Sequence, residues 1–98
     1  MLAELAAQLV AIDSVNPSLV GGGAGEREAA ELVAAWCRQR GLEVELVGDE
    51  RPSVIALKRG SGGGRSLMLN GHIDVVGVEG MIHAPFQVVH ANDAKRIA

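Results

Sequence analysis

Apolar residues recur at helical spacing along the first part of the chain. An amphipathic helix is predicted from residue 2 to about residue 13, with an apolar face formed by Leu2, Leu5, Leu9 and Ile12. We expect it to end before Asn16 and Pro17, because proline disfavours helical geometry in the residue that precedes it.

A second helical pattern follows a glycine-rich break at residues 21–25. This helix is expected from about residue 26 to residue 40, because acidic residues lie in its first turn and basic residues in its last. Gly41 should end it. Cys37 borders the expected buried stripe, so a small core side chain is favoured there over a reactive thiol. The stripe itself consists of Ala29, Leu32, Val33 and Trp36.

Shorter apolar segments predict strands. Residues 42–47 alternate largely between apolar and acidic side chains, as a half-buried strand does. Residues 54–57 are apolar on both faces, which predicts an interior strand. A third apolar strand is expected to begin at residue 67 and to run through His72 to Val76, and the pattern allows a short fourth strand at residues 87–90. We find neither internal repeats nor a linker that would separate two domains.

The composition fits a small globular protein. Of the 98 residues, 48% are hydrophobic and 21% are charged, which argues against wholesale disorder. The net charge of −3 and the scattered basic residues argue against a nucleic-acid partner. A single cysteine leaves no internal disulfide and favours a cytoplasmic location. No membrane partner is expected, because the sequence has neither a good signal peptide nor the roughly 18 apolar residues that a membrane helix needs.

Two glycine-rich loops, at residues 21–25 and 60–64, invite a comparison with phosphate-binding loops. Neither is followed by the Lys and Ser or Thr of a P-loop. The second loop also misses the G-x-G-x-x-G spacing and precedes a strand rather than a helix. Turns between regular elements are therefore favoured over a nucleotide site.

The segment His72-Ile73-Asp74 lies near the end of the third predicted strand. Side chains two apart on a strand point the same way, so His72 and Asp74 should project together. An imidazole there can bind a divalent metal, and a nearby carboxylate can fix its tautomer. Taken alone, the pair favours a structural histidine hydrogen-bonded to a carboxylate over a metal site.

The neighbours of this pair change that balance. Residues 66–76 read SLMLNGHIDVV and resemble the first metal motif of a zinc-dependent amidohydrolase and peptidase family. Acetylornithine deacetylase, succinyl-diaminopimelate desuccinylase, aminoacylase and carboxypeptidase G belong to that family. Further segments match it in the same order along the chain: IDSVNPS at 12–18, GEREAA at 25–30, GLEV at 41–44, VIA at 54–56 and PF at 85–86.

The resemblance implies a fold and a chemistry. Residues 1–89 would form the N-terminal part of a catalytic domain, and residues 90–98 an unmatched tail. The fold would be a partial α/β/α sandwich, with two N-terminal helices on a small, mostly parallel or mixed sheet. His72 would bind one of two zinc ions, and Asp74 would be the catalytic-site carboxylate that orients it. A metal-activated water would attack the amide of an N-acyl amino acid or small peptide.

The remaining metal ligands of the family have no match in this chain. Asp93 stands near the position expected for the metal-bridging aspartate, but the surrounding motif is absent and a ligand role is not favoured. His83 and His90 are expected to be loop histidines. The chain therefore resembles a fragment, of the kind that a frameshift, a premature stop or a deliberate truncation produces. Such a fragment should be inactive and bind zinc weakly at most.

A second hypothesis comes from a different class of protein. The third strand of such a fragment would lack a neighbour on one side, and an unpaired apolar edge favours pairing with another chain. The chain would then be a non-catalytic binding or assembly module that self-associates through its exposed sheet edge.

Overall fold

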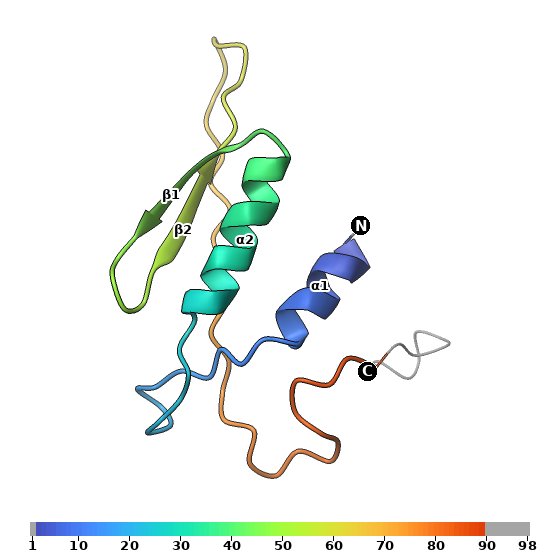
Figure 1. Cartoon of the computed structure of the whole chain (residues 1–98). Helices are drawn as coiled ribbons and strands as arrows, with labels where there is room; N and C mark the ends of the chain where they lie inside the picture. Colours follow the sequence, from blue (N-terminus) through green and yellow to red (C-terminus); the bar gives the residue numbers. More distant parts are fainter. Residues whose placement is uncertain (1, 90–98) are drawn as a thin grey trace.

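The computed structural model of the chain describes residues 2–89. It contains two helices, α1 (Leu2–Val10) and α2 (Arg27–Gln39), followed by two strands, β1 (Glu43–Val47) and β2 (Ser53–Leu57) (Figure 1). The sequence predicted all four elements, with bounds that differ by at most three residues. The largest difference is at the end of α1, where the Asp13 carboxylate accepts a hydrogen bond from the Val15 amide at 3.1 Å and the chain turns away before Pro17.

The two strands form an antiparallel hairpin against one side of α2 (Figure 1). Glu43 pairs with Leu57 at the open end and Val47 with Ser53 beside the turn. Gly48 begins that turn with a φ of 104°, a backbone conformation that glycine adopts without strain. Gly41 ends α2 as expected: it has a φ of 82°, and the next amide, that of Leu42, donates to the carbonyl of Cys37.

The core is small and consists mainly of small side chains. Its buried members are Val15, Ala29, Ala30, Ala34 and Cys37. The burial of Cys37 is confirmed, but the expected stripe is only partly so, because Leu32, Val33 and Trp36 are half-buried. Alanines let α2 approach its neighbours closely, and the larger side chains lie at the margin of the contact.

The prediction of an interior strand at residues 54–57 is wrong. Ile55 and Leu57 are 51% and 45% exposed. The register places these two on the face of the hairpin that also carries Glu43 and Glu45. Helix α2 packs against the hairpin, and the described residues put no second layer over this outer face. Residues 54–57 are thus apolar on both faces of the strand, but the face that points away from α2 is exposed.

The predicted third strand does not form either. Residues 67–76 lie outside any sheet of the described chain, apart from one isolated parallel bridge between Val15 and Val75. Leu67, Met68 and Leu69 are 84–87% exposed. A strand needs a neighbour for its backbone hydrogen bonds, and neither β1 nor β2 pairs with this segment. Residues 87–89 form no strand, and the rest of that predicted segment lies outside the described residues.

The described chain is thus a small α/β arrangement of two helices and a two-stranded antiparallel sheet. Helix α1 lies on the opposite side of α2 from the sheet, so only α2 of the two expected helices packs on the strands (Figure 1). Neither helix in the described part of the chain is long and apolar enough to cross a membrane.

Candidate metal site at His72

Backbone pairing places the predicted site beside the loop that follows α1. The Val75 amide donates to the Ser14 carbonyl at 3.0 Å, and the Asn16 amide donates to the Val75 carbonyl at 2.9 Å. Ser14 and Val15 are buried at this contact. The two bonds join segments that are far apart in sequence and fix where Asp74 lies relative to the loop.

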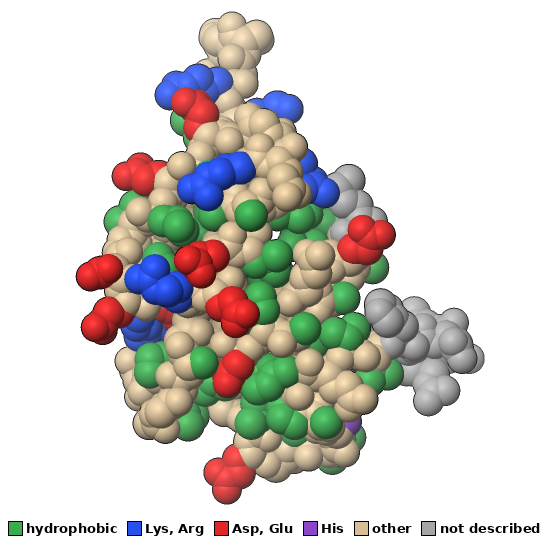
Figure 2. Space-filling view, in the orientation of Figure 1, with side chains coloured by type: hydrophobic (Ala, Val, Ile, Leu, Met, Phe, Trp, Pro, Cys, Tyr) green, Lys and Arg blue, Asp and Glu red, His purple; other side chains and the backbone are tan. Residues whose placement is uncertain are grey.

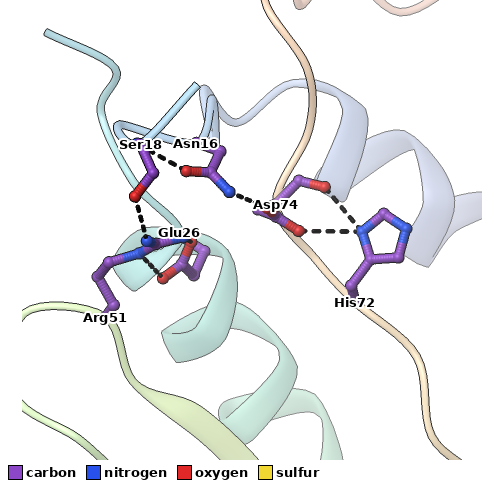
Figure 3. A network of polar contacts seen from close by, with 6 residues as sticks. All are labelled: Asn16, Ser18, Glu26, Arg51, His72 and Asp74. Atoms are coloured by element: carbon purple, nitrogen blue, oxygen red, sulfur yellow. Dashed lines mark hydrogen bonds and ion pairs between the residues drawn. The ribbon is translucent and has the colours of Figure 1, made fainter. Parts of the chain in front are cut away.

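The two predicted site residues, His72 and Asp74, lie in direct contact (Figure 3). The His72 Nδ1 atom is 3.0 Å from both the carbonyl oxygen and the Oδ1 atom of Asp74. Both partners are acceptors, so in the neutral ring Nδ1 carries the proton and Nε2 keeps its lone pair. The His72 side chain is 85% exposed. The pair thus adopts the expected proximity without the expected strand.

A second residue, Asn16, holds the other oxygen of the Asp74 carboxylate. Its Nδ2 donates to Oδ2 at 2.6 Å. This hydrogen bond lowers the pKa of Asp74 below its ordinary value; partial burial opposes the shift, and His72 adds to it. Our sequence analysis did not identify Asn16 as a site residue. Its only signal was its place in the IDSVNPS segment, before a proline.

The polar network continues from Asn16 to the start of α2 (Figure 3). The Ser18 amide donates to Asn16 Oδ1 at 2.7 Å, and Arg51 Nη1 donates to Ser18 Oγ at 3.1 Å. Arg51 also donates to both carboxylate oxygens of Glu26, at 2.9 and 3.2 Å. The Glu26 carboxylate raises the pKa of Arg51. None of Ser18, Glu26 and Arg51 was predicted to support the site.

A shallow, largely apolar pocket of about 250 Å³ opens beside His72. One wall is the end of α1, and the other is the segment that contains the site. The lining residues are Leu9, Val10, Ser14, His72, Ile73, Asp74 and Val75. The imidazole therefore stands at the edge of an open space that could admit a small apolar group.

No other candidate ligand is seen to join this contact within residues 2–89. Among residues 2–89, no group of three or more His, Cys, Asp and Glu side chains is placed to share a metal ion. His83 is exposed, and its Nδ1 contacts the carbonyl of the adjacent Ala84 at 3.1 Å. His90 and Asp93 lie outside the described residues. Of the two histidines that the structure describes, His72 contacts a carboxylate, whereas His83 contacts a backbone carbonyl.

Comparison with known proteins adds no relative. No protein-family model matches the chain, and no significant match was found among curated proteins or solved structures. The resemblance to the zinc-dependent family therefore rests on the sequence motifs of residues 12–86 alone.

Proposed function

We propose that the chain carries the N-terminal part of the catalytic domain of a zinc-dependent hydrolase. His72 is one ligand to one of two zinc ions, and Asp74 is the carboxylate that orients it. The observation that carries the proposal is the pair of 3.0 Å contacts at His72 Nδ1, which leave Nε2 available for a metal. Histidines that bind metals commonly donate their other ring N–H to a carboxylate or a carbonyl.

The proposed reaction is cleavage of an amide bond in an N-acyl amino acid or a small peptide. Zinc supplies a water of lowered pKa and polarises the substrate carbonyl. A catalytic zinc site takes about three protein ligands, and His72 supplies one. The proposal therefore includes weak zinc binding and no hydrolysis by this chain alone. Net charge and the single cysteine support a cytoplasmic protein whose partner is a small molecule rather than a nucleic acid.

The proposed fold is the corresponding part of an α/β/α sandwich with a larger parallel or mixed sheet. Its support is the segment at residues 67–69, where three large apolar side chains are almost fully exposed in the described chain. In such a sandwich this segment would be a strand covered on both faces, as continuous apolar runs usually are.

Titration with zinc, followed by the ¹⁵N signals of the histidine rings, tests the metal role. We expect the His72 Nε2 signal to shift progressively and to saturate only at high zinc concentration. His72→Ala should abolish the response, whereas His83→Ala, which removes another exposed histidine, should leave it intact. A spectrum in which zinc never perturbs His72 would exclude the metal role. Tight, stoichiometric zinc binding, together with amide hydrolysis that His72→Ala abolishes, would instead contradict the claim that this chain carries only part of the metal site.

The exposed apolar residues also favour a second candidate, an assembly module that pairs with another copy through residues 67–69. Apolar side chains are spread widely over the visible face of the molecule (Figure 2). This candidate predicts a folded oligomer of defined size by light scattering and circular dichroism. Met68→Glu should dissociate it, whereas Ser66→Glu, which adds the same charge nearby, should not. A folded monomer, or an aggregate of undefined size, would exclude the module.

A further inference from the structure

The Asp74 carboxylate is held from two sides. Its Oδ1 faces His72 Nδ1 at 3.0 Å, and its Oδ2 accepts from Asn16 Nδ2 at 2.6 Å. The carboxylate of an aspartate can rotate about the Cβ–Cγ bond, and the hydrogen bond from Asn16 restricts that rotation. Asn16 therefore determines which oxygen of the Asp74 carboxylate accepts the hydrogen bond from His72.

The amide of Asn16 is itself held in one orientation. Its Oδ1 accepts from the Ser18 amide at 2.7 Å, so Nδ2 must face Asp74. The reversed amide would place an oxygen against the carboxylate and an NH₂ group against the Ser18 N–H. The backbone of Asn16 is also fixed, because its amide donates to the Val75 carbonyl at 2.9 Å.

The loop that carries Asn16 is anchored to the rest of the fold. Ser18 Oγ accepts from Arg51, and Arg51 is paired through two hydrogen bonds with Glu26. Glu26 is 7% exposed and lies directly before α2, and Arg51 lies in the turn between β1 and β2. Because a carboxylate with so little exposure requires a partner, this pair holds α2, the hairpin and the loop in one arrangement.

We propose that Asn16 is the positioning residue of the site. Through Asp74 it fixes the tautomer and the ring orientation of His72, so that the proton stays on Nδ1 and the lone pair of Nε2 faces outward. The purpose of this arrangement rests on the proposed metal function. The tautomer itself does not, because it follows from hydrogen bonds that exist without a metal.

The test is the tautomer of His72, read from long-range ¹H–¹⁵N spectra of the metal-free protein at a pH where imidazole is neutral. The native chain should carry its proton on Nδ1. Asn16→Ala should move His72 part of the way toward the mixture of tautomers that a free imidazole adopts, because the Asp74 carbonyl can still accept from Nδ1. Asn16→Asp keeps the shape but replaces the donor by an acceptor, and it should have the same effect. Asn70→Ala, which truncates an exposed asparagine two residues from His72, should change nothing.

Three results would overturn the inference. The first is a native chain in which His72 is already a mixture of tautomers, a measurement that needs no variant to fold. The second is an Nδ1-protonated His72 that persists in both Asn16 variants. The third is a change in the His72 tautomer that is as large in Asn70→Ala as in Asn16→Ala. Circular dichroism and the dispersion of amide signals identify any variant that has lost its fold.

Zinc titration of the same variants separates this inference from the proposed function. We expect Asn16→Ala to weaken zinc binding at His72 about tenfold, as loss of a group that supports a metal ligand usually does. If the His72 tautomer depends on Asn16 but zinc does not bind His72, the positioning role of Asn16 is supported and the metal role of His72 is excluded. If the native chain and Asn16→Ala bind zinc at His72 equally well and have the same His72 tautomer, the metal role is supported and the positioning role of Asn16 is excluded.

Discussion

Arg51 and Glu26 form a paired, two-bond contact, with Nε 2.9 Å from Oε1 and Nη2 3.2 Å from Oε2. The side chain of Glu26 is 10% exposed, whereas that of Arg51 is 41% exposed. The cost of removing a carboxylate from water is offset here by a guanidinium that still reaches solvent. Arg51 also donates to Ser18 Oγ at 3.1 Å, which ties the loop that carries Asn16 to the α2–hairpin unit.

Arg51→Met should therefore lower the melting temperature measured by circular dichroism, since it leaves the Glu26 carboxylate enclosed and unpaired. Arg59→Met is the matched control. Arg59 also pairs with a glutamate, Glu43, at 2.7 Å, but both side chains are mostly exposed and such pairs contribute little. Equal changes in melting temperature for the two variants would contradict the role assigned to the Arg51 pair.

The close approach of α2 to its neighbours gives a second prediction. Ala34 is fully buried, and Ala35, the next residue on the helix, is exposed. Ala34→Leu should lower the free energy of unfolding by about 1–3 kcal/mol, because the added atoms have no room. Ala35→Leu adds the same side chain toward solvent and should change stability by less than about 0.5 kcal/mol. Urea denaturation of both variants measures the difference, and similar midpoints would show that the core is not closely packed at Ala34.

Much of the local structure was predictable from the sequence, because it depends on short-range periodicity. Helices α1 and α2 show a helical apolar period, and β1 shows alternation. The predicted strand at residues 67–76 failed for a different reason. An apolar run indicates that a segment can be buried in a sheet, but the neighbour that would pair with it must come from elsewhere in the chain.

The site divides in the same way. The contact between His72 and Asp74 was predicted from a spacing of two residues, and an extended backbone is enough to produce it. Asn16 lies 58 residues before Asp74, so no local pattern could show that its amide completes the site. The same holds for Arg51 and Glu26, whose pairing depends on how the hairpin folds back on α2.

A third prediction concerns pH. The hydrogen bond from Asn16 lowers the pKa of Asp74 in the folded chain. The contact therefore stabilises the fold fully above the ordinary aspartate pKa of about 3.9. This stabilisation is lost as the pH falls through the lower pKa of the folded chain. The carboxyl ¹³C signal of Asp74 should titrate at lower pH than that of an unfolded chain. In Asn16→Ala, the pKa of Asp74 should rise toward the ordinary value. An identical titration in the native chain and the variant would show that Asn16 does not stabilise the charged form.

Gly23 provides the last prediction, because it lies where the loop after α1 folds back on itself. A Cβ atom at this position would lie 2.7 Å from the Val15 carbonyl oxygen and 3.2 Å from the carbonyl carbon of Asn16. Gly23→Ala should therefore displace the backbone beside Asn16, lower the free energy of unfolding by about 1–3 kcal/mol and speed hydrogen exchange at the Asn16 and Val75 amides. Gly21→Ala is the control in the same loop, since a Cβ there meets nothing within 4 Å. It should be neutral or slightly stabilising, because alanine restricts the unfolded chain. Exchange at Asn16 that is unchanged in Gly23→Ala would mean that the loop tolerates the clash without moving the site.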